Sequence, residues 1–119
     1  MKKDPKIFLN HILESIELIE KNTKNLSQDG FSKNTTVQDA VIRRLEIIGE
    51  ATKNLPDEFK NRYPEIEWKK IAGLRDVIVH GYFHLSLKLV WKITQNNIPI
   101  LKKEITAILD SIEKQAKLL

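Results

Sequence analysis

The segment "GLRDVIVHGYF", residues 73–83, places an arginine, a histidine and a tyrosine among valine, isoleucine and leucine. A guanidinium offers a planar fork of donors that suits a phosphate, and an imidazole can transfer protons near neutral pH. These residue types therefore suit chemistry on a phosphate ester. Each also has an ordinary structural role: Arg75 as a paired or snorkelling cation, His80 as a lone structural histidine, and Tyr82 as an amphipathic packing residue.

Arg75 is placed near the centre of an apolar arc. On a helical wheel at about 100° per residue, five apolar side chains fall within an arc of roughly 120°. They are Trp68, Ile71, Ala72, Ile78 and Val79. An unpaired charge in a core is costly, so either a carboxylate pairs with Arg75 or the arc lines a cleft or a subunit interface. His80 is about 140° further round an ideal helix. The two side chains converge only if the helix ends or distorts before His80, and Gly81 favours such an end.

A second charged group lies on an earlier predicted helix. Arg43, Glu46 and Glu50 fall within about 60° of one another, opposite the apolar stripe of that helix. The two glutamates are one turn apart, which is unfavourable unless a cation lies between them. Either Arg43 or Arg75 from the neighbouring helix can supply that cation. A solvated charged face is the alternative interpretation.

Several other chemistries are excluded by the sequence. There is no cysteine, no glycine-rich phosphate loop, no HExxH pair and no nucleophile elbow. His11, His80 and His84 do not make a metal set, because Gly81 interrupts the helix between the last two. We therefore predict no metal and no cofactor.

The elements that must position these residues are helices. The apolar spacing is helical throughout, and no stretch alternates with a period of two. We predict one domain over residues 1–119, an all-α, up-and-down bundle of four to five helices. The first helix begins at Pro5 with Asp4 as its cap and ends near residues 27–34. The second begins near residue 35, capped by Thr35 or Thr36.

The later helices are marked by prolines and a glycine. A segment between Pro56 and Pro64 holds one or two helical turns, and a third long helix runs from Pro64 to Gly81. A fourth covers residues 84–97 with Ser86 as its cap. A fifth begins at residue 98, with Pro99 near its start.

The charge and hydropathy of the chain agree with an intracellular protein. The formal net charge is +4, which is compatible with an RNA partner but equally with solvated lysine-rich helix faces. The start of the chain has no signal-peptide pattern, and no apolar run approaches the roughly 20 residues that span a membrane. The absence of cysteine fits a reducing compartment. We expect a soluble, cytoplasmic protein with no membrane partner.

The combination Arg75, four residues, His80, one residue, Tyr82 resembles the R-x4-H-x-Y motif of HepT-like proteins in the HEPN superfamily. "RRLEIIGEA" at residues 43–51, tryptophan at 68 and "VW" at residues 90–91 also resemble that family. Position 76 is Asp, where asparagine is often found, so the charge around Arg75 departs from the common pattern.

The resemblance implies a helical bundle that forms a homodimer through the face bearing the motif. It implies metal-independent RNA cleavage by Arg75 and His80, in the toxin of a type II toxin–antitoxin system. It also implies an MNT-type nucleotidyltransferase antitoxin as partner, which transfers AMP to Tyr82 and silences the toxin.

The residues support this interpretation in chemical terms. RNA carries its own nucleophile, the 2′-hydroxyl, so cleavage needs proton transfer and charge stabilisation rather than a metal. A two-fold dimer would bring two Arg–His pairs to one cleft. Asp76, Arg43, Glu46 and Glu50 are the supporting residues.

Two alternative functions and one choice between roles for two lysines remain open at this point. A non-catalytic module could bind a nucleotide or a protein partner in the same cleft, and a purely structural dimer could use Arg75 and His80 as interface residues. Lys69 and Lys70 are candidate RNA backbone contacts, although a solvated helix face explains them equally.

Overall fold

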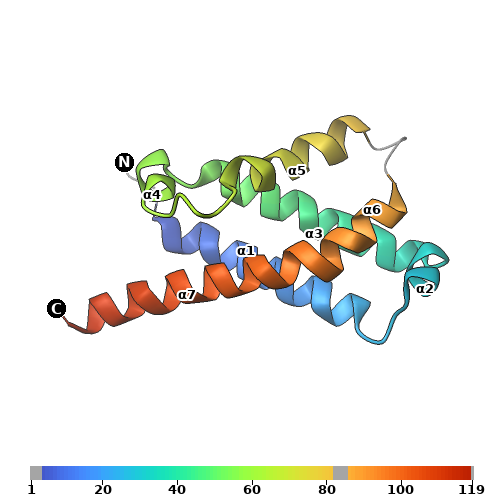
Figure 1. The fold of residues 1–119 in the computed structure, drawn as a ribbon, viewed down its shortest axis with the longest axis horizontal. Helices are drawn as coiled ribbons and strands as arrows, with labels where there is room; N and C mark the ends of the chain where they lie inside the picture. Colours follow the sequence, from blue (N-terminus) through green and yellow to red (C-terminus); the bar gives the residue numbers. More distant parts are fainter. Residues whose placement is uncertain (1–3, 82–85, 119) are drawn as a thin grey trace.

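The fold was analysed in a computed structural model, which describes residues 4–81 and 86–118. The described residues form helices and connecting turns, with no strand among them. The long helices α1 (Pro5–Thr23), α3 (Thr35–Asn54) and α5 (Trp68–Gly81) run antiparallel in chain order, and the chain returns through α6 and α7 (Figure 1). The predicted all-α, up-and-down bundle is confirmed.

Helices α1 and α3 form the centre of the bundle, and α1 also contacts α7. Asp4 caps α1 by accepting a hydrogen bond from the Lys6 backbone N–H at 3.0 Å, with Pro5 at the first helical position. The stripes of both helices are buried almost completely, and their core side chains are Leu9, Ile12, Ile16, Ile19, Val41, Leu45, Ile48 and Thr52. Apolar spacing therefore predicted the faces that build the core.

The start of α3 differs from the prediction. Neither threonine caps it; Asn34 does, because its side-chain oxygen accepts a hydrogen bond from Val37 N–H at 3.1 Å. The preceding segment also folds into a short helix, α2 (Gln28–Ser32), which buries Phe31 completely. The rings of Phe31 and Trp91 pack at a tilt, with their centroids 5.3 Å apart, and this contact links α2 to the later part of the chain.

The start of α5 was also predicted too early. After α4 (Asp57–Asn61), the chain makes turns rather than helix from Pro64 onward, and α5 begins at Trp68. The Trp68 indole N–H donates to the backbone carbonyls of Lys60, at 3.2 Å, and Tyr63, at 3.0 Å. These two hydrogen bonds and the burial of Ile66 hold the turn against α5.

The last part of the chain is one continuous helical rod. Helix α6 (Leu87–Lys92), capped by Ser86 as predicted, passes through a π-helical turn, η2 (Ile93–Asn97), into α7 (Ile98–Lys117). Pro99 lacks the N–H for an α-helical bond and its ring crowds the preceding turn. A π turn widens the helix at that point, so the proline marks a change of winding rather than a break.

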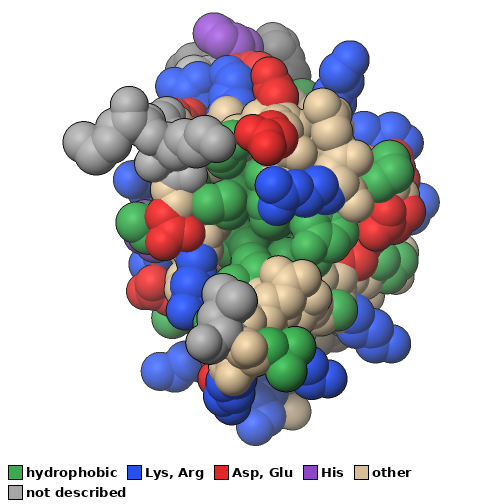
Figure 2. Space-filling view, turned by 90° about the vertical axis from the view of Figure 1, so that its left-hand side faces the viewer, with side chains coloured by type: hydrophobic (Ala, Val, Ile, Leu, Met, Phe, Trp, Pro, Cys, Tyr) green, Lys and Arg blue, Asp and Glu red, His purple; other side chains and the backbone are tan. Residues whose placement is uncertain are grey.

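The bundle is elongated, with principal extents of 51 × 30 × 23 Å, and the C-terminal turns of α7 extend beyond the other helices (Figure 1). At this end, hydrophobic side chains gather in the centre of the visible face and charged ones surround them (Figure 2). None of the helices in the described part of the chain is both long and apolar enough to cross a membrane.

Candidate functional site

A close approach between α3 and α5 brings Arg75 next to the charged residues of α3. A Cβ atom added to Gly49 would lie 2.7 Å from the backbone nitrogen and 3.0 Å from the Cβ of Arg75, and 3.3 Å from the carbonyl oxygen of Ala72. Real Cβ atoms do not come so close to backbone, so only glycine permits this packing distance. Gly49 therefore sets the position of Arg75 against α3.

The Arg75 guanidinium is anchored on one side by carboxylates. Its Nε atom lies 2.8 Å from Glu50 Oε2, and its Nη1 atom lies 3.6 Å from Asp76 Oδ1. The Arg75 side chain is 37% exposed and Glu50 is 53% exposed, so solvent screens this pair. These two carboxylates contact Nε and Nη1, whereas a guanidinium carries five N–H donors. The arginine is thus held in place with donors still available.

The Asp76 carboxylate is shared between two cations. Its Oδ1 atom lies 3.3 Å from Lys53 Nζ and 3.6 Å from Arg75 Nη1. Lys53 comes from the end of α3 and Arg75 from the middle of α5, so this carboxylate links the two helices electrostatically. A phosphate group could replace Asp76 as the counter-ion of either cation.

The two glutamates of α3 take different partners. Arg43 donates to Glu46 at 2.7 Å within the helix, whereas Glu50 faces Arg75. The repulsion between the carboxylates of Glu46 and Glu50 is therefore offset, because each carboxylate has its own cation. These residues and Arg75 line a groove of about 330 Å³ that also includes His11 from α1. His11 is exposed and lies edge-on to Phe8, with ring centroids 6.5 Å apart.

His80 is not brought to this groove within one chain. Helix α5 ends at Gly81, as predicted, so it does not end before His80 and the condition for Arg75 and His80 to converge is not met. On a continuous helix, a separation of five residues leaves Arg75 and His80 about 140° apart. His80 is exposed in the last turn of α5. Tyr82 and His84 lie outside the described residues, as does the side chain of Val79.

Lys69 and Lys70 lie on different sides of α5. Lys70 pairs with Glu67 at 2.7 Å, and this hydrogen bond and charge raise the pKa of the Lys70 ammonium. Lys70 lines a groove of about 370 Å³ between α5 and α7. Lys69 lines another groove, on the side of α3 and α4, and has no ion-pair partner in the described part of the chain.

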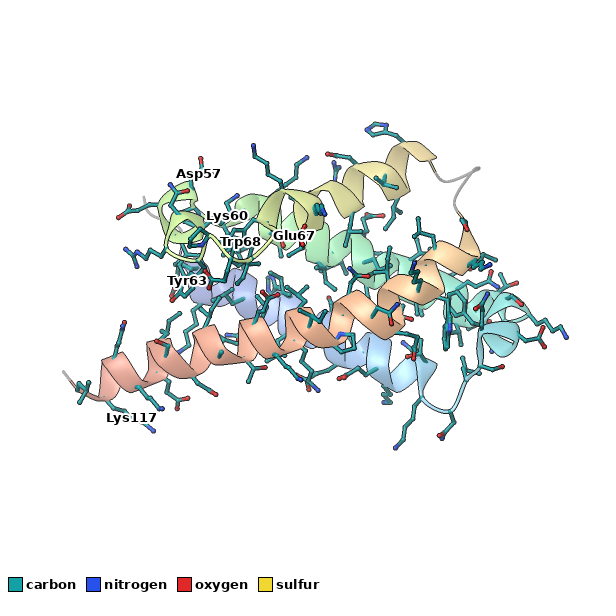
Figure 3. The ribbon with its side chains drawn as sticks, viewed as in Figure 1. Asp57, Lys60, Tyr63, Glu67, Trp68 and Lys117 are labelled. Atoms are coloured by element: carbon teal, nitrogen blue, oxygen red, sulfur yellow. The ribbon has the colours of Figure 1, made fainter. Side chains whose placement is uncertain are left out.

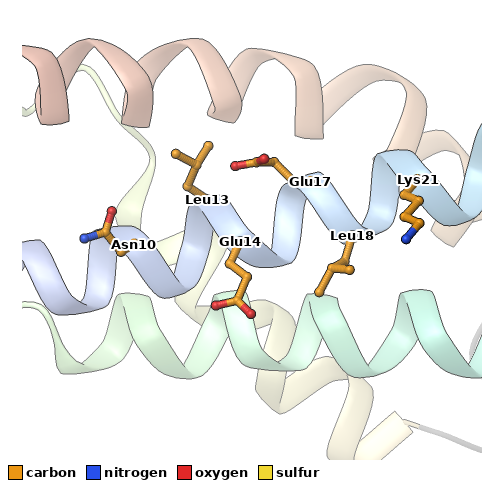
Figure 4. A pocket seen from close by; sticks show the side chains of 6 residues that line it. All are labelled: Asn10, Leu13, Glu14, Glu17, Leu18 and Lys21. Carbon is orange, nitrogen blue, oxygen red and sulfur yellow. The ribbon is translucent and has the colours of Figure 1, made fainter.

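Two further features bear on the choice of site. In the described part of the chain, no three His, Cys, Asp or Glu side chains are grouped so that they could hold a metal ion. A shallow groove on α1, flanked by α3 and α7, is lined by Glu14, Glu17, Lys21 and three uncharged side chains (Figure 4). It contains none of the residues that the sequence nominated.

Sequence reasoning missed two contributors to the Arg75 groove. Gly49 stands in the "LEIIGEA" block, but a helical glycine gives no sign of which neighbour it approaches. His11 is far from the motif in sequence and was considered only as a metal ligand. His11 lines the groove because α1 packs on α3, and Gly49 contributes by letting α5 bring Arg75 close to α3.

Comparisons with known proteins agree with the motif. A Methanocaldococcus jannaschii protein named "Gamma-glutamylcyclotransferase and putative RNase" is 53% identical over 114 residues, 96% of this chain and 51% of its own length. The chain thus spans about half of that relative. A protein named "Putative RNase" from the same organism is 46% identical over 112 residues, 94% of this chain and 93% of its own.

A third relative carries the family's name. "Probable ribonuclease HepT" of Thermococcus cleftensis is 45% identical over 102 residues, 86% of this chain and 93% of its own. No solved structure matches the chain. Residues 12–108 match the family described as "Ribonuclease HepT-like", a span that includes Glu50 and Arg75. The chain belongs to the HepT-like ribonuclease family.

Proposed function

We propose that this chain is a metal-independent endoribonuclease, the toxin of a type II toxin–antitoxin system. The observation that supports this best is the state of Arg75. Glu50 lies 2.8 Å from its Nε atom, and the Arg75 side chain is still 37% exposed. An arginine anchored in this way offers donors to a phosphate as negative charge develops in the transition state. Family membership supplies the substrate class, RNA.

The reaction would use the 2′-hydroxyl of RNA as nucleophile. The 2′-oxygen attacks the adjacent phosphorus and loses its proton, and the bond from phosphorus to the 5′-oxygen breaks. The departing oxygen takes up a proton, which leaves a 2′,3′-cyclic phosphate and a 5′-hydroxyl. Arg75 would stabilise the charged phosphorane, and His80 would move protons.

A dimer would reconcile this chemistry with the geometry of one chain. Because α5 stays helical through Gly81, Arg75 and His80 of one protomer face different directions. A homodimer formed through the motif-bearing face would place His80 of one protomer near Arg75 of its partner. Sedimentation at micromolar concentration tests this requirement, and a purely monomeric protein that cleaves RNA would contradict it.

The experiment that tests the activity is cleavage of a mixed RNA pool in excess chelator. The parent protein is compared with Arg75→Ala, His80→Ala and His11→Ala, and the ends of the products are analysed. We expect cyclic-phosphate ends from the parent and loss of cleavage in Arg75→Ala and His80→Ala. His11 lines the Arg75 groove, so its variant is the matched histidine control. If only His11→Ala lost activity, the proton-transfer role would pass to His11.

The alternative function, binding without turnover, predicts RNA or nucleotide binding by a parent that leaves the RNA intact. Mass spectrometry must first show that this parent protein carries no AMP. A purely structural role for Arg75 predicts instead that a hydrophobic replacement is tolerated or stabilising.

Silencing by AMP transfer to Tyr82 completes the proposal. The modification would add bulk and a negative phosphodiester near the motif. Intact-mass spectrometry after incubation with ATP and the cognate nucleotidyltransferase tests it, with Tyr82→Phe as control. A gain of one AMP by the parent and none by the variant is expected. Equal labelling of both would exclude Tyr82 as the acceptor.

A further inference from the structure

The groove beside Lys69, here called the basic groove, adjoins the Arg75 site. It has a volume of about 500 Å³ and lies between the end of α3, α4 and the first turns of α5. Its cations are Lys53, Lys60 and Lys69, and its anions are Asp57 and Glu67. Lys60, Asp57, Glu67 and Trp68 lie together where α4 meets the start of α5 (Figure 3).

The anions of the basic groove do not neutralise all its cations. Asp57 is 3.5 Å from Lys60, and Glu67 is directed to Lys70 at 2.7 Å on the other side of α5. Lys69 keeps its charge without a partner among the described residues, and Lys53 shares Asp76 with Arg75. Among the residues that the structure describes, the groove therefore offers one cation without a partner, Lys69, and a second, Lys53, whose only partner is a shared, half-exposed carboxylate.

The basic groove is connected to Arg75 through that carboxylate. Lys53 Nζ and Arg75 Nη1 lie 3.3 and 3.6 Å from the same Asp76 Oδ1 atom. On α5, Lys69, Ala72 and Asp76 follow one another at three- and four-residue spacing, so they share one face. Lys53, from α3, therefore lies both beside the carboxylate that Arg75 contacts and in the groove that Lys69 lines.

The opposite side of α5 could not guide a polyanion. The groove between α5 and α7 is lined by Glu65, Glu67 and Glu104, with Lys70 as its only described cation. A strand that leaves Arg75 toward the start of α5 meets this acidic lining or the basic groove. Electrostatics favours the second path.

We propose that the basic groove binds the phosphodiester backbone of the substrate RNA next to the scissile phosphate, through Lys53 and Lys69. This inference rests on the proposed ribonuclease function and adds a direction to it: the strand runs from Arg75 toward α4. Binding of the backbone there displaces Asp76 as counter-ion of Lys53 and Arg75. The lysines position RNA and take no part in bond breaking.

The test measures affinity and cleavage separately. The probe is a short fluorescent 2′-O-methyl oligoribonucleotide, which cannot be cleaved because its 2′-oxygens are blocked. The variant Lys53→Gln/Lys69→Gln keeps most of both side chains and removes two charges. The matched control, Lys114→Gln/Lys117→Gln, removes two exposed charges from the last turns of α7. Thermal unfolding checks that both variants are folded.

The groove variant is expected to bind the probe at least about ten-fold more weakly than the parent near 0.1 M salt. The slope of log affinity against log salt concentration should be smaller by about 1.4, the value for two lost phosphate contacts on a single strand. In cleavage of unmodified RNA, its KM should rise more than its kcat falls. Asp76→Asn should bind the probe more tightly, because the competing carboxylate is lost. The α7 control should bind like the parent.

Other outcomes separate the two proposals. A parent that cleaves and binds RNA, with a groove variant indistinguishable from the α7 control, would overturn the groove proposal and leave the ribonuclease standing. A parent that neither binds the probe nor cleaves RNA would overturn both. An Asp76→Asn protein that binds more weakly would show that Asp76 does not compete with the backbone.

Discussion

The two sides of α5 differ in packing and in charge. On the side of α3, Gly49 lets the helices approach until an added Cβ would overlap Arg75, and the groove beyond is lined by three lysines and two acidic residues. On the side of α7, the helices are less closely packed, and three glutamates surround an apolar crevice. One helix thus separates a tightly held, cationic face from an open, anionic one.

The difference in charge between the two sides arises from the pairing of lysines, not from their number. The formal charge of +4 is spread over many lysines, so composition alone indicates no RNA path. Pairing decides which cations remain available: Glu67 takes Lys70, whereas Lys69 keeps no described partner. Because adjacent residues of a helix are about 100° apart, Lys69 and Lys70 then line different grooves.

The largest expected effect comes from removing Arg75, the cation on the side of α5 that packs closely against α3. Arg75→Ala should lower the rate of RNA cleavage by roughly 100-fold or more, the scale of losing one donor to a developing charge. The free energy of unfolding should change by less than about 1 kcal/mol, because the Arg75–Glu50 pair is partly exposed. Single-turnover cleavage and urea unfolding measure the two effects. Arg62→Ala on the surface is the control, and equal losses in both variants would contradict a special role.

The next effect tests the close packing itself. Gly49→Ala should destabilise the protein by about 1–2 kcal/mol, since overpacking outweighs the gain in helix propensity. Gly73→Ala on α5 is a matched control, because its added Cβ meets no atom within 4 Å. That variant should gain up to about 1 kcal/mol from helix propensity. Urea unfolding of both compares them directly, and two stabilised variants would show that α3 and α5 separate at little cost.

A smaller effect separates the neighbouring lysines. Lys69→Gln should weaken binding of the 2′-O-methyl probe about five-fold near 0.1 M salt, the contribution of one phosphate contact. Lys70→Gln should have a smaller effect because Glu67 already pairs with Lys70. Titrations by fluorescence anisotropy at two salt concentrations measure both. A larger effect at Lys70 would reverse the assignment of the two sides.

The smallest effect concerns the acidic groove. Burial, and then the charges of Glu65 and Glu67, raise the pKa of the Glu104 carboxyl above its ordinary value of 4.5. The folded state therefore holds this proton more tightly than the unfolded state, so stability from this group falls as pH rises through the raised pKa.

Glu104→Gln should remove that pH dependence and raise the free energy of unfolding at pH 7 by less than about 1 kcal/mol. Unfolding measured between pH 4 and 7 tests the sign, with Asp110→Asn on the exposed face of α7 as control. A variant that is less stable at neutral pH would show that the Glu104 charge is favourable where it lies.

The sequence by itself determined the elements and most of the core. Apolar stripes such as Leu9–Ile19 and Val41–Thr52 are periodic because each helix must bury one face, and local signals such as Asp4–Pro5 and Ser86 mark helix starts. Where two local signals competed, prediction failed. Asn34 rather than Thr35 caps α3 through a local hydrogen bond from Val37 N–H. The turn held by the Trp68 indole delays α5 because it depends on carbonyls of Lys60 and Tyr63, outside that helix.

Only the tertiary structure decided how the chemical residues combine. The motif nominated Arg75 and His80, and the helix wheel grouped Glu46 with Glu50, but neither shows which carboxylate faces which cation. The approach at Gly49 selects Glu50 for Arg75, and Asp76 joins Lys53 to it. Such pairings depend on distances between helices, which no single-helix periodicity contains. The same holds for Lys69 and Lys70, whose difference arises from what packs on each side of α5.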